Sequence, residues 1–283
     1  MKKFSKKVLA VLLMLAMMFT FAACGGNDEP AATDGETEGD GSLQKVLDAG
    51  VLEIGAEGNW VPYVYNDENG DLVGFEVEMA KAIADKLGVE VNYNIADSWD
   101  GVLAGLEADR YDVVICGAGP TPERKEKYEV ARPYGEQVVA LVCRADDESI
   151  QGFEDLEGKT SANSLSSSSG NIARAYGAEL VEASLEEAMM LIQENRADCQ
   201  VNDAYAISVY LEKNPDANLR IADYYEPENA YEVQSAPIIK KGNVDLCEAI
   251  DAAVAEIIEE GTARELCVKY FGEDFANGVT LYQ

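Results

Sequence analysis

The sequence contains no histidine among its 283 residues, so it lacks the commonest general base and the commonest zinc ligand of proteins. Basic residues are scarce, because 22 lysines and arginines stand against 53 aspartates and glutamates, a formal net charge of −31. Such a chain does not neutralise phosphates, and we expect no nucleic-acid partner. A surface of one sign suits a soluble protein that repels its own copies, so we expect a monomer.

The six cysteines show no pair with the spacing of metal ligands. One of them ends the N-terminal apolar segment. The others lie in strand-like runs or on the apolar faces of the last two expected helices, namely Cys116, Cys143, Cys199, Cys247 and Cys267. We interpret these five as buried free thiols, and we expect neither a metal nor a cofactor.

The N-terminus has the features of a targeting segment. Lysine-rich residues precede an apolar stretch of 16 residues, Val8 to Ala23, which ends at Cys24. A membrane-spanning helix needs about 20 apolar residues, so a signal peptide is favoured over an uncleaved anchor. The segment FAAC resembles the bacterial lipoprotein box, with Phe21 where leucine is usual. The resemblance implies that residues 1–23 are removed and that lipid on Cys24 anchors the protein to the outer face of the cell membrane.

Residues 24–42 then form an acidic linker. Between Gly25 and Ser42 there are six acidic residues, no basic residue and no apolar residue larger than alanine. This composition cannot bury a core, and we expect a disordered tether.

From residue 43 onward, short apolar strands alternate with helical patterns, which is typical of an α/β fold. In the segment GFEVEMAKAIADKLG, apolar residues recur every four positions from Phe75 to Leu87, and Gly88 ends the pattern. The run Val113 to Cys116 fits a central parallel strand buried on both faces, and it stops at Gly117.

A faint internal repeat relates LEADRYDVVICGAG (106–119) to IQENRADCQVNDAY (192–205) without a gap. In each copy a helix is expected to lead into a strand, and the strands end at Gly117 and at Asp203. Open α/β sheets bind ligands at the carboxyl ends of their strands, so these two positions are expected to face a shared cleft. The alternative is a chance match of a few residues.

These segments, from Val51 to Gly272, resemble the amino-acid-binding family 3 of bacterial extracellular solute-binding proteins, the receptors of ABC importers. The resemblance implies a type II periplasmic-binding-protein fold, in which two Rossmann-like α/β lobes are joined by two crossing strands. Lobe 1 would comprise residues 43–139 and 235–283, and lobe 2 residues 140–234. The crossings are expected near Val138–Leu141 and Val233–Ala236.

The segment TPERK contains the residue that the resemblance implies for the ligand's carboxylate. Thr121 suits a helix cap and Pro122 the first helical position, so Arg124 projects from a fixed turn and its fork matches a carboxylate bidentately. The resemblance implies this role; without it, a solvated helix arginine is the alternative. Ser167 and Ser168, at a helix N-terminus, are implied as a second anion clamp, the alternative being a flexible serine loop.

For the ligand's ammonium group the resemblance implies Asp203, assisted by the carbonyl of Gly117. Asp203 also suits the cap of the following helix, and both roles are compatible. Many family members have a hydroxyl side chain where this chain has Gly119, so we expect Gly119 to contribute only its backbone.

The resemblance also implies that the ligand's side chain lies between two aromatic residues, and Trp60 and Trp99, the only tryptophans of the chain, occupy the matching positions. Glu57 occupies a position that often touches this side chain, and a carboxylate there favours a polar or cationic group. Core tryptophans and a surface glutamate are the respective alternatives.

The resemblance therefore implies capture of a free L-amino acid, polar, cationic or cystine-like, and its delivery to the membrane permease of an ABC transporter. One alternative is a dehydratase-like enzyme acting on small carboxylates, which the absence of a base beside residues 166–169 disfavours. Another is a surface ligand sensor on the same fold. Without histidine, affinity is expected to be nearly flat between about pH 6 and 8.

Overall fold

The computed structural model describes residues 39–282. The expected signal peptide, the lipidated Cys24 and most of the expected linker therefore lie outside the described residues. Within residues 39–282, none of the helices combines the length and the apolarity that crossing a membrane requires.

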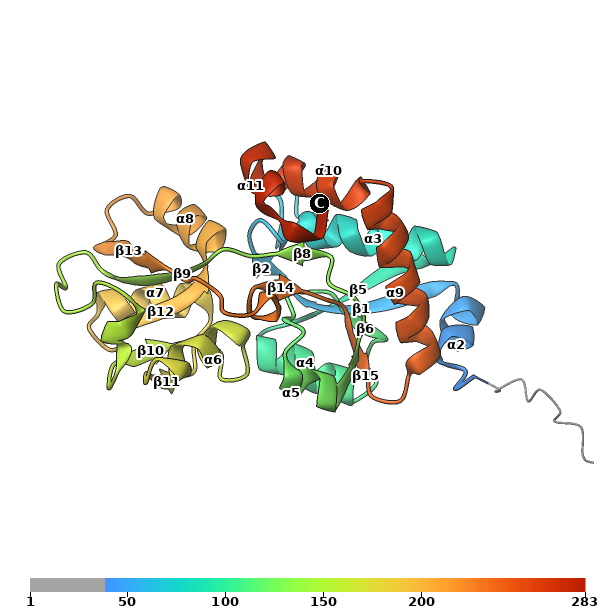
Figure 1. The fold of residues 1–283 in the computed structure, drawn as a ribbon, viewed down its shortest axis with the longest axis horizontal. Helices are drawn as coiled ribbons and strands as arrows, with labels where there is room; N and C mark the ends of the chain where they lie inside the picture. The colour runs from blue at the N-terminus through green and yellow to red at the C-terminus, as the bar shows by residue number, and fades with distance from the viewer. Residues whose placement is uncertain (1–38, 283) are drawn as a thin grey trace, which may run out of the picture. The chain divides into compact units, whose positions relative to one another are not determined.

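The first five-stranded sheet has the order β5-β1-β6-β15-β7 (Figure 1). Its strands are Glu90–Ala96 (β5), Val51–Glu57 (β1), Val113–Val114 (β6), Ile238–Lys240 (β15) and Tyr128–Val130 (β7). Strands β5, β1 and β6 are parallel, whereas β15 runs antiparallel to both of its neighbours. A separate three-stranded sheet joins Asn59–Trp60 (β2), Val64–Asn66 (β3) and Leu72–Val73 (β4).

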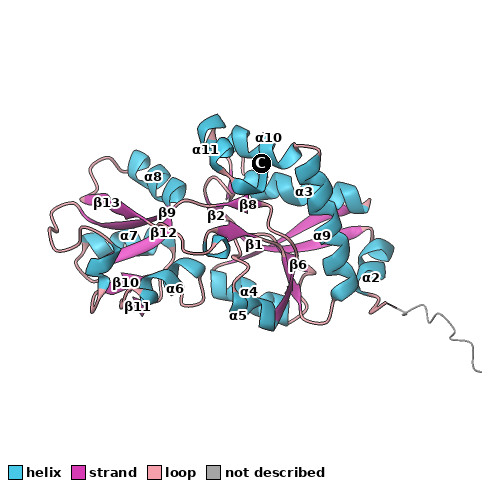
Figure 2. Ribbon diagram, viewed as in Figure 1, coloured by secondary structure: helices cyan, strands magenta, loops and turns pink. Residues whose placement is uncertain are grey.

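Helices cover both faces of the first sheet (Figure 2). Alternate strand residues point to opposite sides, so Val113 packs with one apolar cluster and Val114 with the other. The first cluster is completed by α2 (Ser42–Ala49), α3 (Phe75–Leu87), α9 (Val244–Glu259) and α10 (Thr262–Phe271), and the second by α4 (Trp99–Glu107). Helix α11 (Glu273–Gly278) follows α10.

The second five-stranded sheet has the order β11-β10-β12-β9-β13. Its strands are Glu179–Val181 (β11), Thr160–Ala162 (β10), Cys199–Asp203 (β12), Val139–Arg144 (β9) and Leu219–Tyr224 (β13). Helix α6 (Ser168–Ala175) packs on one face, while α7 (Leu185–Gln193) and α8 (Ala204–Lys213) pack on the other. The two sheets, each with its helices, form the expected pair of α/β lobes.

The internal repeat is confirmed by the sheet topology. Strand β6 has a parallel neighbour on one side and an antiparallel neighbour on the other, and β12, its counterpart in the repeat, has the same arrangement. In each copy a helix, α4 or α7, precedes this strand.

Two antiparallel chain segments join the lobes. Gly135–Glu136 (β8) pairs with Gln234–Ser235 (β14), and Gln137 N donates to the Val233 carbonyl at 2.7 Å. The second crossing matches the expected Val233–Ala236. The first begins before the expected Val138, because β8 is already paired at Gly135.

The end of the expected linker takes part in the fold. The Asp40 carboxylate accepts hydrogen bonds from the backbone N–H groups of Val244 and Asp245 at 2.5 and 3.0 Å, and Ser42 Oγ accepts from Leu246 N at 3.1 Å. These contacts satisfy N–H groups at the start of α9, which have no partner within the helix. Asp40 and Ser42 therefore already contact α9, ahead of residue 43, where lobe 1 was expected to begin. Hydrogen bonds from Ser42 and from the backbone N–H groups of Asp245 and Val244 lower the pKa of Asp40 to about 2.

We predict that Asp40→Ala lowers the melting temperature by a few degrees, because α9 loses its cap. Thermal unfolding followed by circular dichroism measures the change. The matched control is Asp216→Ala, an exposed aspartate in a turn, which leaves the melting temperature unchanged. Equal melting temperatures for Asp40→Ala and the wild type would show that the cap contributes nothing.

Candidate functional site

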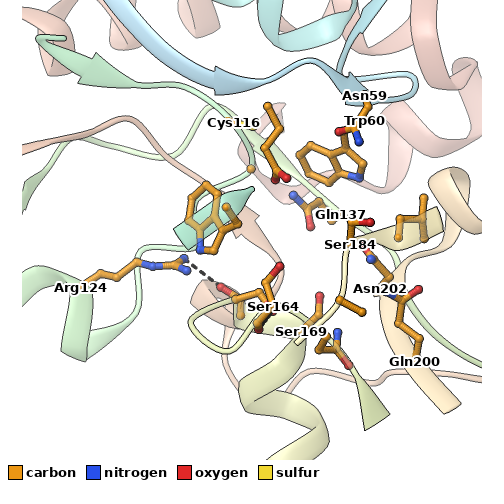
Figure 3. Close-up of a pocket in the computed structure, with 18 residues that line it drawn as sticks. Asn59, Trp60, Cys116, Arg124, Gln137, Ser164, Ser169, Ser184, Gln200 and Asn202 are labelled. Carbon is orange, nitrogen blue, oxygen red and sulfur yellow. Dashed lines mark hydrogen bonds between the residues drawn. The ribbon is translucent and has the colours of Figure 1, made fainter. Parts of the chain in front are cut away.

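A cavity lies between the two lobes, at the carboxyl ends of β1, β6, β10 and β11 and beside β12 (Figure 3). It encloses about 760 Å³ of space free of atoms, counted with its opening to solvent. Seven of the nine expected ligand-binding residues line it, namely Glu57, Trp60, Trp99, Gly117, Arg124, Ser167 and Ser168.

Arg124 is fixed in place by the local chain. It lies in the first turn of α5 (Pro122–Lys127), where Thr121 Oγ1 accepts from the backbone N–H of Arg124 at 3.2 Å. This is the expected cap. The side chain is 7% exposed, and its Cζ lies 5.2 Å from the centroid of the Trp99 ring. Burial lowers the pKa of Arg124 to about 10, so the guanidinium remains a cation at neutral pH.

The guanidinium is held by neutral oxygens. Nη1 donates to the Gly119 carbonyl and to Ser168 Oγ, each at 3.0 Å, and Nη2 donates to the Ser166 carbonyl at 2.9 Å. None of the carboxylates in the described part of the chain forms an ion pair with Arg124. A buried charge is costly without a counter-ion, so this arrangement favours a bound anion.

Gly119 does not line the cavity. Its carbonyl accepts from Arg124 Nη1, and a backbone contact of Gly119 with the ligand stays a prediction. A side chain here would meet the second lobe, since a Cβ atom would lie 2.7 Å from Ser168 Oγ. Because Gly119 has no side chain, the hydroxyl group of Ser168 has room beside it. Ser167 caps α6, because its Oγ accepts from Gly170 N at 3.0 Å.

Asp203 also lies outside the cavity lining. It is fully buried, and its carboxylate accepts from Tyr63 Oη at 2.8 Å and from Ala206 N at 2.9 Å. The second bond is the expected cap of α8, whereas the role toward an ammonium group stays a prediction. The bond from Tyr63 crosses from the first lobe to the second, as do those from Arg124 to Ser166 and Ser168. The lobes are therefore in direct contact around the cavity.

Gly117 sits between Trp60 and a buried carboxylate. Its φ is 63°, and a Cβ atom would lie 2.3 Å from the Trp60 ring, so only glycine fits. Its N–H donates to Glu76 Oε1 at 2.8 Å, and the same oxygen accepts from Tyr134 Oη at 2.6 Å. Glu76 therefore fixes the position of Gly117 at the end of its strand. Glu76 was not among the expected site residues; it lies on the otherwise apolar face of α3.

Five amide side chains in the lining were also missed: Asn59, Gln137, Asn163, Gln200 and Asn202. No local motif marks them. The alternation in β12 was a usable signal, because Gln200 and Asn202 share one face while Cys199 and Val201 lie on the other. Two buried lining atoms have no hydrogen-bond partner among the described residues: Trp99 Nε1, a donor, and Gln200 Oε1, an acceptor.

Three carboxyl groups at or beside the cavity have raised pKa values. Burial, with the nearby charges of Asp100 and Glu182, raises the pKa of Glu57 to about 7. Burial raises the pKa of Glu76 to about 7 and that of Asp203 to about 6. These raised pKa values predict a pH dependence of affinity, in place of the flat one expected from the absence of histidine.

A sequence model of the bacterial extracellular solute-binding proteins, family 3, matches residues 52–273. The L-cystine-binding protein TcyA of Bacillus subtilis is 34% identical over 275 residues, covering 95% of this chain and 98% of TcyA. Among solved structures, an ancestral arginine-binding protein bound to arginine matches with a TM-score of 0.70 and 34% identity, covering 79% of this chain and 99% of that one. The unliganded, open L-cystine solute receptor of Neisseria gonorrhoeae matches with a TM-score of 0.53 and 35% identity, covering 83% and 98%.

The chain belongs to family 3 of the bacterial extracellular solute-binding proteins. It is a solute-binding protein rather than an enzyme, and the expected two-lobed type II fold is confirmed. The sequence identity to these two solved structures is nearly equal, yet the TM-score is higher for the ligand-bound structure than for the open, unliganded one. This difference agrees with the direct hydrogen bonds between the lobes.

We predict that the free energy of unfolding falls as pH rises from about 5 to 8. A carboxyl group whose pKa is raised by folding stabilises the folded state below its unfolded pKa, 4.5 for Glu76, and this stabilisation is lost as pH passes its folded pKa, about 7. Urea unfolding at both pH values measures the change. Repulsion within a chain of net charge −31 acts in the same direction.

Glu76→Gln isolates the contribution of one carboxyl group, because the amide oxygen still accepts from Gly117 and Tyr134 but cannot ionise. The variant is expected to lose less stability between pH 5 and 8 than the wild type. An identical pH dependence in both proteins would contradict the raised pKa of Glu76.

Proposed function

We propose that this protein captures a free L-amino acid outside the cell membrane and delivers it to the permease of an ABC importer. The observation that carries the proposal is the buried guanidinium of Arg124, which forms no ion pair with any carboxylate among residues 39–282. The α-carboxylate of an amino acid provides the missing negative charge. Family membership supports the same class of ligand, since TcyA is an L-cystine-binding protein and the ancestral relative was solved with arginine.

Binding is proposed to draw on both lobes. Arg124 belongs to the first lobe, whereas Ser167 and Ser168 belong to the second. One carboxylate therefore contacts both only when the lobes are closed. Charge-assisted hydrogen bonds contribute about 1.5–3 kcal/mol each, and micromolar affinity corresponds to about −8 kcal/mol. A few such bonds are sufficient for both affinity and closure.

The ligand's side chain is proposed to be polar, cationic or cystine-like. Trp60 and Trp99 supply flat apolar walls, but most other lining side chains carry amide, hydroxyl or carboxyl groups. Glu57 adds a carboxylate whose ionised form a positive charge would stabilise. The α-ammonium is assigned to Asp203 and the Gly117 carbonyl, which requires Tyr63 to share or release the Asp203 carboxylate.

The finer assignments complete the proposal. Lipid on Cys24 would hold the mature monomer at the outer face of the membrane, with the acidic linker giving it reach toward the permease. The lobes are proposed to divide near residues 139/140 and 234/235, next to the paired β8 and β14 segments; β9 of the second sheet already begins at Val139.

We predict that Arg124→Met abolishes amino-acid binding without unfolding the protein. Removing one partner of a buried charge pair costs about 2–5 kcal/mol, so affinity is expected to fall roughly 100-fold or more. Calorimetric titration with L-cystine, L-arginine and L-glutamine measures the affinity, and tryptophan fluorescence reports binding independently. The melting temperature of the ligand-free variant should not fall, because methionine keeps the apolar stem and removes an uncompensated charge.

Lys125→Met is the matched control, since Lys125 lies in the same helix but is exposed. It is expected to bind as the wild type does. Wild-type affinity in Arg124→Met would reject the assignment of Arg124 to the carboxylate.

A further inference from the structure

Gln200 is a buried glutamine whose side-chain oxygen has no partner. The residue is 1% exposed, it lies in β12 at the centre of the second lobe's sheet, and it lines the cavity. Its Oε1 is one of the few buried side-chain polar atoms in the described part of the chain that make no hydrogen bond. An unsatisfied buried acceptor is costly, and such a group in a binding cavity calls for a donor.

The backbone fixes the face of the sheet on which the Gln200 side chain lies. Residues 199, 201 and 203 of β12 face one side of the sheet, where Cys199 and Val201 join an apolar cluster. Gln200 and Asn202 face the other side, toward the cavity. Register with β9 pairs Gln200 with Val142 and Asn202 with Ala140, so neither neighbour offers a side-chain donor.

The cavity has donors and acceptors at separate places. Figure 3 shows Arg124 on one side of the cavity and Gln200 with Asn202 on the opposite side, with Ser164 and Ser169 between them. At the Arg124 side the unpartnered Trp99 Nε1 adds a second donor beside the guanidinium. A ligand that places its carboxylate at Arg124 therefore directs its other end toward the acceptor of Gln200.

We infer that Gln200 Oε1 accepts a hydrogen bond from an N–H group at the far end of the ligand's side chain. The site then selects L-amino acids whose side chain ends in such a donor: a guanidinium, an ammonium, a carboxamide, or the second ammonium of cystine. This inference rests on the proposed function. The inference also deepens the proposed function. Arg124 recognises the α-carboxylate that all amino acids share, whereas Gln200 recognises the N–H group at the end of the side chain, which differs among them.

The chemistry separates Gln200 from Glu57. Glu57 is a carboxyl group and favours a positive charge, whereas a neutral amide oxygen accepts from charged and uncharged donors alike. Gln200 thereby accounts for recognition of a neutral carboxamide, which a carboxylate alone does not single out.

Three pairs of ligands test the inference, each differing in the distal donor. L-lysine is compared with L-norleucine, L-glutamine with L-methionine, and L-cystine with the mixed disulfide of L-cysteine and 3-mercaptopropionate, which lacks the second ammonium. Calorimetric titration of the wild type is expected to show at least one donor ligand bound roughly 10–100-fold tighter than its partner. In Gln200→Leu this preference is expected to fall by about tenfold or more, with the largest fall for L-glutamine.

The melting temperature of the ligand-free protein gives a second readout. Replacing an unsatisfied buried amide by leucine removes a desolvation cost, so Gln200→Leu is expected to melt at or above the wild-type temperature. Gln193→Leu, outside the cavity on the exposed side of α7, controls for the substitution itself and leaves every ligand preference unchanged.

The outcomes separate this inference from the proposed function. Unchanged preferences in Gln200→Leu, or tighter binding of the ligands without a distal donor by the wild type, would overturn the role of Gln200 while amino-acid binding stands. A fall in the melting temperature of Gln200→Leu would show that Oε1 already has a partner, which also overturns it. If the wild type binds none of the three donor ligands, the proposed function itself fails.

Discussion

A guanidinium buried without a carboxylate partner is the constraint on which the rest of the site depends. Arg124 keeps its charge, because burial lowers its pKa only to about 10, and neutral oxygens from both lobes surround it. Such a group is costly in the free protein, and the cost is recovered only when an anion arrives. The same interaction that binds the ligand therefore also favours lobe closure, because the oxygens and hydroxyls around Arg124 come from opposite sides of the cleft.

The remaining polar groups make the two ends of the site differ in hydrogen-bonding character. Donors gather at Arg124 and Trp99, whereas Gln200 and Glu57 present oxygens. Beneath them, Glu76 fixes the Gly117 strand end, and Asp203 is held by Tyr63 from the facing lobe. A zwitterion with a polar side chain matches this distribution, since each end meets groups of the opposite hydrogen-bonding character.

Local signals predicted the α/β class and part of the site, whereas the two-lobed arrangement came from the resemblance to the family. The TPERK segment contains its own cap, so the place of Arg124 was predictable, and the repeat anticipated that β6 and β12 occupy equivalent positions. For Gln200 and Asn202 the alternation in β12 was the only signal, and their place in the cavity, like that of Asn163, depends on the pairing of distant strands. The setting of Asp203 was not predictable, because its partner Tyr63 lies 140 residues away in the chain. The raised pKa values likewise depend on burial, which no local pattern specifies.

The most direct test of the central claim changes the ligand rather than the protein. Titration compares the L-amino acid that binds most tightly among arginine, glutamine and cystine with the same compound whose α-carboxylates are converted to carboxamides. The modified ligand has no α-carboxylate to neutralise the charge of Arg124, so a loss of affinity of roughly 100-fold or more is expected. Binding of the amide within about threefold of the acid would contradict the account.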